Sequence, residues 1–306
     1  MRNTFVKTLT KIAEKDKNVY LLTGDLGYSL FDDFRKRFPD QFVNCGVAEQ
    51  NMIGVAAGLA LEGKEVYVYS IVPFVTMRCF EQIRNDVCYQ DLDVNLVGVG
   101  AGFAYGSLGS THHAIEDIAI LRTLPNMTVL SPADPMETEK LVYCSYQTSH
   151  PTYLRLYRSG EDNLYKEELN VEIGKPSVVK EGSDGLIIAT GVNVGLGLEV
   201  VEKLKELNYN FKLISLHTLK PINKEALLKE IGGIDKIFTL EEHNIIGGLG
   251  SSVAEIISES DWNGFFERIA IPDRYPSKVG SSDYLRAENK LDVGSITENI
   301  LSKIRK

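Results

Sequence analysis

Short apolar runs alternate with helical patterns along most of this 306-residue chain. In the first half, runs rich in Val, Ile, Leu and Tyr occupy residues 19–23, 42–44, 65–71, 94–99, 127–130 and 152–156. Strands separated by helical segments form βαβ units, because a parallel strand can be reached only through a crossover. The alternation therefore predicts a mostly parallel α/β sheet covered by helices on both faces.

Apolar residues at helical spacing predict helices over residues 5–15, 30–37, 49–62, 74–87, 111–122 and 135–146. Residues 159–176 break this rhythm with glycine, proline and acidic residues. A second series follows, with expected strands at 185–190, 211–215 and 236–240 and helices at 195–206, 224–231 and 252–258. We therefore expect two α/β domains, residues 1–160 and 177–306, joined by a linker over residues 161–176.

The net charge of −9 argues against a dedicated nucleic-acid surface. The four cysteines show no C-x-x-C spacing, so neither a zinc site nor a disulfide framework is predicted. The first residues open into an amphipathic helix rather than a signal peptide, and no apolar run is long enough to span a bilayer. We expect a cytoplasmic protein whose partners are small molecules or other proteins.

Glu49 stands at the start of a helical pattern that is rich in small residues, namely Gly54, Ala56, Ala57, Gly58 and Ala60. The helix dipole stabilises a Glu49 anion, whereas an apolar setting favours the protonated form. This balance suits a hydrogen bond with a shared proton, and a simple capping glutamate is the alternative. Small residues inside a helix mark close approach of a backbone or ligand, so we expect something large to pack there.

Two glycine-bearing segments lie where strands lead into helices. Residues 106–117 bring His112 and His113 from a loop into an expected helix, at the carboxyl end of a strand where open α/β sheets bind ligands. Hydrogen bonding to a substrate oxygen or proton transfer suits them better than a zinc site, and a capping or core role is the alternative. Residues 247–250 lack the phosphate-binding fingerprints, so a tight turn is favoured over a phosphate cradle.

Several motifs occur together in an order and at distances that resemble the C-terminal half of transketolases. They are Gly46-Val47-Ala48-Glu49-Gln50, the aromatic-bearing residues 74–82, Gly109-Ser110-Thr111-His112-His113, Leu124-Pro125-Asn126-Met127, Ser131-Pro132-Ala133-Asp134, Glu241-Glu242-His243-Asn244 and Gly247-Gly248-Leu249-Gly250. The chain resembles the C-terminal subunit of a split transketolase. By that resemblance, residues 1–160 correspond to the pyrimidine-binding domain and residues 177–306 to the transketolase C-terminal domain.

This resemblance implies thiamine diphosphate as the cofactor, which carries the carbanion chemistry. In the family, a separate diphosphate-binding domain holds Mg²⁺ through a Gly-Asp-Gly motif followed by asparagine, whereas this chain has only Gly24-Asp25-Leu26. The resemblance therefore implies that an N-terminal partner subunit holds Mg²⁺ and that this chain has no metal site of its own. Activity is expected only in an α2β2 heterotetramer with that partner.

The resemblance also assigns roles to individual residues. Glu49 hydrogen-bonds N1′ of the aminopyrimidine and favours the imino tautomer whose N4′ removes the C2 proton, and His112 contacts oxygens of a ketose donor. The implied cofactor-binding residues are Asp25, Leu26, Glu49, Phe74, Val75 and Phe80, and the implied substrate-binding residues are Ser29, Arg78, His112, His113 and Arg158. Core packing for the aromatic residues and a structural ion pair for Arg78 are the alternatives.

The expected reaction is ketol transfer, in which a two-carbon unit passes from a ketose or ketose phosphate to an aldehyde. Leu108 replaces a family aspartate that contacts a substrate hydroxyl, and Gly100 replaces a phosphate-contacting histidine, which suggests a specialised sugar. The alternatives are a 2-oxo acid dehydrogenase β subunit and an acyloin-forming enzyme similar to deoxyxylulose phosphate synthase, for which Arg78 is the hint. A non-catalytic assembly subunit is a further alternative, which Glu49 and His112 argue against.

Overall fold

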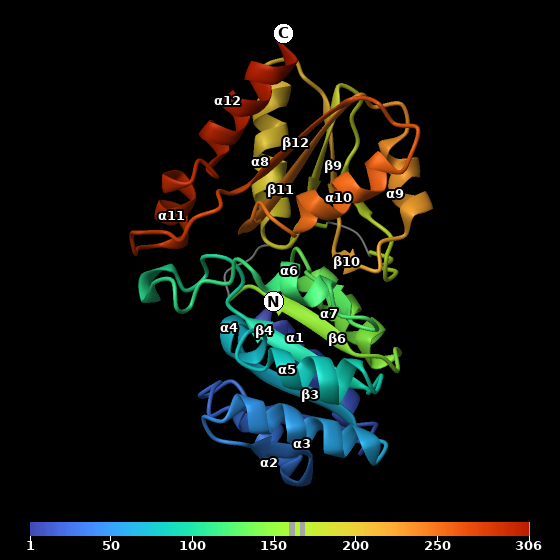
Figure 1. Ribbon diagram of the computed structural model, residues 1–306, viewed down its shortest axis with the longest axis vertical. Coiled ribbons are helices and arrows are strands. Elements are labelled where there is room, and N and C mark those ends of the chain that lie inside the picture. Colours follow the sequence, from blue (N-terminus) through green and yellow to red (C-terminus); the bar gives the residue numbers. More distant parts are fainter. Residues whose placement is uncertain (159–162, 166–168, 306) are drawn as a thin grey trace.

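The computed structural model describes residues 1–158, 163–165 and 169–305, which form two α/β units stacked end to end (Figure 1). The expected linker over residues 161–176 lies partly outside the described residues. None of the helices in the described ranges has the length and apolar character needed to cross a bilayer. The prediction of two mostly parallel sheets flanked by helices is confirmed.

Across the described residues, the sheet of the first unit has seven strands in the order β10-β5-β6-β4-β3-β1-β2. Six of these strands are parallel: β1 (Val19–Thr23), β2 (Phe42–Asn44), β3 (Glu65–Ile71), β4 (Val94–Val99), β5 (Thr128–Leu130) and β6 (Thr152–Leu156). Helices α1 (Arg2–Ala13) and α7 (Pro135–Tyr146) cover one face, and α3 (Glu49–Leu61) and α6 (Asp117–Arg122) pack over the other. Because both faces are covered, β4 and β6 are buried along their whole length.

The sheet of the second unit has the strand order β12-β11-β8-β9-β7 in the part of the chain described. Its strands are β7 (Ser177–Lys180), β8 (Gly185–Ala189), β9 (Phe211–Ser215), β11 (Lys236–Asn244) and β12 (Phe265–Ile271). One face is covered by α8 (Asn193–Glu206) and α12 (Val293–Ile304), the other by α9 (Lys224–Ile231) and α10 (Leu249–Ser258). The chain winds to opposite sides of β8, so the carboxyl ends of β8 and β11 form a topological switch point.

The prediction of one helix over residues 74–87 is wrong, because this segment forms several short helices separated by a turn. Helix α4 (Val72–Val75) ends in a turn, and α5 (Phe80–Gln82) continues into a π-helix, Ile83–Cys88. Thr76 Oγ1 donates to the Val72 carbonyl at 2.7 Å. Such a local side-chain bond competes with the regular helical pattern, and it lies at the point where α4 ends.

The helix expected over residues 111–122 is also wrong in its first half, since only α6 (Asp117–Arg122) is helical. Ala114 and Gly102 form an isolated antiparallel bridge with two hydrogen bonds of 3.0 Å. The amide and the carbonyl of Ala114 are therefore bonded to Gly102 and not to helical neighbours, and the helix begins only after this residue. His112 and His113 lie in a loop as a result.

The sequence patterns also omitted several elements. These are β7, β12, α12, the strand β10 (Thr218–Lys220), the helix α11 (Ser282–Glu288) and the short helices Pro39–Gln41 and Gly106–Leu108. Strand β10 belongs to the second half of the chain but pairs antiparallel with β5 of the first sheet. No local pattern encodes such a pairing, because it depends on how the two units dock.

A buried ion pair of the first unit lies at the junction with the second unit and is bonded to it. Arg155 of β6 donates through Nε to Asp117 Oδ2 at 2.8 Å, and their side chains are 3% and 0% exposed. Arg155 Nη2 also donates to the carbonyls of Ala114 at 2.8 Å and Glu242 at 3.1 Å. Tyr153 OH donates to the same Asp117 carboxylate at 2.7 Å. Since a buried charge is tolerated only when it is paired and hydrogen-bonded, this set fixes the junction.

We predict that Asp117→Asn lowers the free energy of unfolding by about 3–5 kcal/mol, because the Arg155 guanidinium is left buried without its counter-charge. Urea denaturation of the full chain measures this loss. The control is Asp32→Asn, which removes an exposed ion pair with Arg35 and is expected to cost less than about 1 kcal/mol. Equal losses in the two variants would contradict the role of Asp117.

Candidate active site

Glu49 lies at the topological switch point of the first sheet, between the carboxyl ends of β1 and β3. It is the first residue of α3 and is 2% exposed. Gly24, which follows β1, is so close that a Cβ there would lie 3.4 Å from Glu49 Cγ, and Ser70 of β3 lies 3.5 Å from Glu49 Oε1. Open α/β sheets bind ligands at such a point, so the fold places this carboxylate where a ligand is expected.

Three further side chains form a series of contacts that starts at the Glu49 carboxylate. Arg78 Nη1 lies 2.6 Å from Glu49 Oε2, with 43% of the arginine side chain exposed. The Arg78 guanidinium stacks on the Phe74 ring at 4.4 Å, and that ring meets His112 edge-on at 5.2 Å. We call these four residues the Glu49 cluster. It brings both predicted catalytic residues, Glu49 and His112, into one continuous set of contacts.

The ion pair expected as an alternative role for Arg78 is therefore present. Cys79 lies next to it, and burial, with the Glu49 carboxylate as a smaller cause, raises the pKa of the Cys79 thiol to about 12. The Cys79 side chain is neutral at physiological pH and contacts the Phe74 carbonyl, with Sγ and oxygen 3.2 Å apart. A buried, neutral thiol of this kind is a poor nucleophile.

The predicted residues after β1 are held by an asparagine that sequence reasoning missed. Asn44, the last residue of β2, accepts hydrogen bonds from the amides of Asp25 and Gly46 at 3.0 Å and donates to the Asp25 carboxylate at 3.0 Å. Asp25, Leu26 and Asn44 help line a small cavity of about 110 Å³. Ser29 lies in the exposed turn that follows. The sequence did offer a signal for Asn44: it is a polar residue at the carboxyl end of an expected strand, where open α/β sheets bind ligands.

The other predicted residues lie apart from the Glu49 cluster. Val75 is fully buried in the core, and Phe80 packs half-buried against the same core, so Phe74 is the aromatic residue that joins the cluster. Arg158 is exposed, with its guanidinium 5.4 Å from the Tyr105 ring centre. The substrate and cofactor roles of these residues stay predictions.

His113 does not accompany its neighbour. Its ring is buried edge-on to Phe103 at 5.2 Å, and its Nε2 lies 3.4 Å from the Gly106 carbonyl. Burial lowers the pKa of His113, so the ring is neutral at physiological pH. His112, which is half-buried, is the histidine of this loop that remains available to a ligand.

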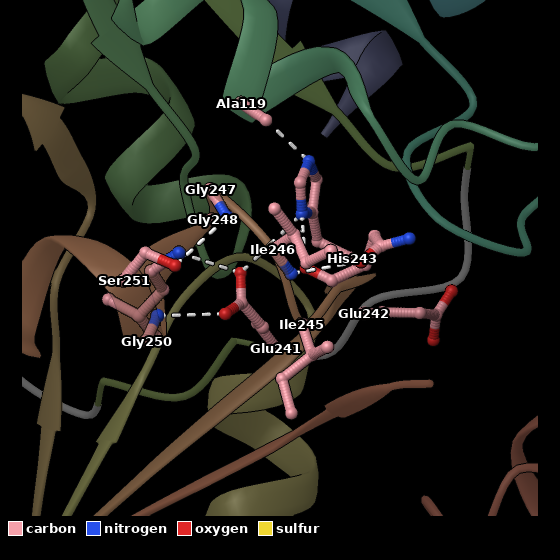
Figure 2. A network of polar contacts seen from close by, with 12 residues as sticks. Ala119, Glu241, Glu242, His243, Ile245, Ile246, Gly247, Gly248, Gly250 and Ser251 are labelled. Atoms are coloured by element: carbon pink, nitrogen blue, oxygen red, sulfur yellow. Dashed lines mark hydrogen bonds and ion pairs between the residues drawn. The ribbon is translucent and has the colours of Figure 1, made fainter. Parts of the chain in front are cut away.

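Residues 247–250 form the tight turn that the sequence favoured over a phosphate cradle. The amides of Leu249 and Gly250 donate to the Glu241 carboxylate at 2.7 and 2.8 Å (Figure 2). A Cβ at Gly248 would overlap with that carboxylate. Burial raises the pKa of Glu241 to about 7. The chain's own carboxylate thus takes the position that an anion would need at the start of α10.

One face of α3 is open, although the sequence suggested that something large packs on it. Met52 and Ile53 are buried, but Gly54 and Gly58 are exposed, and a Cβ at either glycine would have no described atom within 4 Å. Val55 is exposed on the same helix, and Val47 is exposed just before it. Within the part of the chain described, α3 is therefore half-buried: Ala56 and Ala57 face the core, whereas Gly54 and Gly58 face outward.

Comparisons with known proteins match both units to one family. Residues 1–160 match the model of the transketolase pyrimidine-binding domain, and residues 174–296 match that of the transketolase C-terminal domain. The chain is 39% identical over its full length to 96% of a putative transketolase C-terminal section of Methanocaldococcus jannaschii. It is 36% identical, also over its full length, to 97% of a subunit of the apulose-4-phosphate transketolase of Phocaeicola vulgatus.

A solved structure described as the inactive β4 tetramer of a split-gene transketolase superimposes with a TM-score of 0.89 at 33% identity. The match covers 99% of this chain and 97% of that one. The matches to both domain models, the identities over the full length and the shared fold agree with the resemblance noted in the sequence motifs. The chain belongs to the transketolase family.

Proposed function

We propose that this chain is the C-terminal subunit of a two-subunit, thiamine diphosphate-dependent transketolase. The observation that carries the proposal is the Glu49 cluster, in which a buried carboxylate, an arginine, an aromatic ring and a histidine are in contact at a topological switch point. Such a point is where α/β sheets bind ligands. Family membership and the names of the relatives support the same assignment.

The residues present fit one end of the cofactor. A carboxyl group that is 2% exposed and a neighbouring aromatic ring suit a planar heterocycle with a nitrogen acceptor, as in the aminopyrimidine. Among the described residues, no group of three or more His, Cys, Asp or Glu could hold a metal ion. We therefore assign the diphosphate and Mg²⁺ to an N-terminal partner subunit, in an α2β2 assembly.

Each residue then has a definite task. When bound, thiamine diphosphate supplies the carbanion chemistry. From its buried position at the start of α3, Glu49 would hydrogen-bond the pyrimidine N1′ and exchange a proton there. His112 hydrogen-bonds the oxygens of the ketose donor, and Arg158 pairs with its terminal phosphate. Asp25, Leu26 and Phe74 position the pyrimidine.

The substrate we propose is a specialised ketose phosphate. A side chain at Gly100 would overlap with the Tyr105 ring, and Tyr105 lies against Arg158, so the ring occupies the space where other transketolases carry a phosphate-contacting histidine. Leu108 is exposed and presents no hydrogen-bonding group from its side chain. The relative named for apulose 4-phosphate supports a ketose with a terminal phosphate.

We predict that the chain, mixed with its N-terminal partner subunit, Mg²⁺ and thiamine diphosphate, transfers a ketol unit and that Glu49→Gln lowers this rate by about 10²–10⁴-fold. A neutral amide cannot share a proton with N1′. The assay follows an aldehyde acceptor with apulose 4-phosphate or xylulose 5-phosphate as donor.

The control is Glu62→Gln, which changes an exposed carboxylate just after α3 and leaves the rate unaltered. Release of CO2 from pyruvate without ketol transfer would replace the proposal with the acyloin-forming alternative. Full activity of this chain without a partner would refute the split arrangement.

The open face of α3 is where we place part of the partner contact. Gly58→Ala is predicted to stabilise the isolated chain by about 0.5–1 kcal/mol, because alanine favours the helix and its Cβ has open space. The same Cβ is predicted to weaken binding of the partner subunit. Urea denaturation measures the first effect and isothermal titration with the partner measures the second.

A matched control is Gly195→Ala in α8, where a Cβ would make only an ordinary contact with Leu164. This variant is expected to favour its helix equally and to leave partner binding unchanged. If both variants bind the partner as the natural chain does, the α3 face is not part of the contact.

A further inference from the structure

The backbone bonds within the loop that carries His112 are short-range ones, such as the bond from the His112 amide to the Gly109 carbonyl at 2.9 Å. We call residues 102–114 the histidine loop. Its base is the bridge between Gly102 and Ala114, and inside it lies only the single helical turn Gly106–Leu108 among the described elements. A loop of this length with one fixed base needs outside contacts if His112 is to keep one position.

The second unit supplies those contacts along the whole loop. Ser282 Oγ donates to the Phe103 carbonyl at 2.9 Å, and the Gly280 amide donates to the Gly106 carbonyl at 3.3 Å. Ser110 Oγ donates to the Pro276 carbonyl at 3.2 Å. Residues 276–282 thus run beside the histidine loop and bind its backbone.

Among the described residues of the second unit, Glu242 is the one whose charged side chain bonds the backbone of the histidine loop. Its side chain is 1% exposed, Oε1 accepts the Phe103 amide at 2.5 Å, and Oε2 accepts Arg286 Nε at 2.5 Å. A Cβ at Gly102 would overlap with the same carboxylate. Arg286 Nη2 in turn donates to Tyr157 OH at 3.3 Å. The carboxylate is therefore fixed on one side and directed at the loop on the other.

Glu242 also stands at the topological switch point of the second sheet, at the carboxyl end of β11. In open α/β sheets this crevice usually receives a ligand. Here two groups of the first unit lie at this point: the Arg155 side chain donates to the Glu242 carbonyl, and the Phe103 amide donates to the Glu242 carboxylate. In the second unit, the histidine loop therefore lies where such sheets usually bind a ligand.

We propose that Glu242 is a positioning residue for His112. Arg286 fixes the Glu242 carboxylate, and this carboxylate in turn binds the Phe103 amide. The bond holds the histidine loop in the position in which His112 contacts Phe74 of the Glu49 cluster. Glu242 touches neither substrate nor cofactor in this role. The effect on catalysis rests on the proposed function, whereas the effect on the loop does not.

The test compares Glu242→Gln with Glu241→Gln. The two carboxylates are adjacent on β11 and each is 1% exposed, but they point in different directions: Glu241 binds the turn before α10, and Glu242 points away from it (Figure 2). Both variants lose a buried carboxylate, so a general loss of stability appears in both. Only Glu242→Gln removes a charge-assisted bond to the histidine loop.

Hydrogen–deuterium exchange on the full chain gives the first readout. Glu242→Gln is expected to speed amide exchange at residues 102–114 by about tenfold or more, because a charge-assisted hydrogen bond is replaced by a neutral one and the remaining amide group faces Arg286. Glu241→Gln is expected to speed exchange at residues 247–251 and to leave the histidine loop unchanged.

Kinetics of the reconstituted complex give the second readout, with apulose 4-phosphate or xylulose 5-phosphate as donor. Glu242→Gln is expected to lower kcat/KM for the donor by about 100-fold, since a small displacement of a contacting group is that costly. The Kd for thiamine diphosphate is expected to stay unchanged, because Glu49 and Phe74 lie outside the loop. Glu241→Gln is expected to keep the natural kcat/KM.

The two readouts separate the possible failures. Unchanged exchange of the histidine loop in Glu242→Gln, or the same faster exchange in Glu241→Gln, overturns the positioning role whether or not the complex is a transketolase. Faster loop exchange in a complex without ketol transfer supports the inference and rejects the proposed function. If Glu242→Gln does not fold, Ser282→Ala removes the bond to the Phe103 carbonyl without changing a charge, and faster loop exchange is again the expected result.

Discussion

The arrangement of the two units depends on the buried Arg155, which is paired with Asp117 in the first unit and also bonded to the second unit. Arg155 belongs to β6 of the first sheet, and its guanidinium also binds the base of the histidine loop at Ala114 and the backbone of the second unit at Glu242. A charge without water nearby cannot leave its partners without a large cost in free energy. One side chain therefore fixes sheet, loop and second unit relative to each other.

The same topology that forms the parallel sheets also gathers the site. Parallel strands end at one edge, so residues after β1, β2 and β3 meet although they are far apart in the sequence. Glu49 uses the switch point of the first sheet, and Glu242 uses that of the second. At the first point Glu49 pairs with Arg78, which is partly exposed, whereas at the second Glu242 binds the histidine loop.

Sequence periodicity was sufficient for most strands and helices, because burial on both faces leaves a clear apolar signal. The strand Glu65–Ile71 and the helix Pro135–Tyr146 have the bounds that their patterns predict. The pattern failed at residues 111–116 and 76–79. In the first case the bridge between Ala114 and Gly102 withholds backbone groups from the helix, and in the second a threonine hydroxyl bonds the preceding turn. Neither contact is visible in local spacing.

By itself the sequence determined the fold class, the family and the position of Glu49 at the start of its helix, since these depend on periodicity and on the local order of motifs. Only the tertiary structure decided which predicted residues come together. It joined Phe74, Arg78 and His112 to Glu49, buried Val75 and His113, and turned the outward face of α3 into an open surface. The physical reason is that side-chain neighbours across a sheet edge and between docked units are set by chain crossings and packing, which no local pattern records.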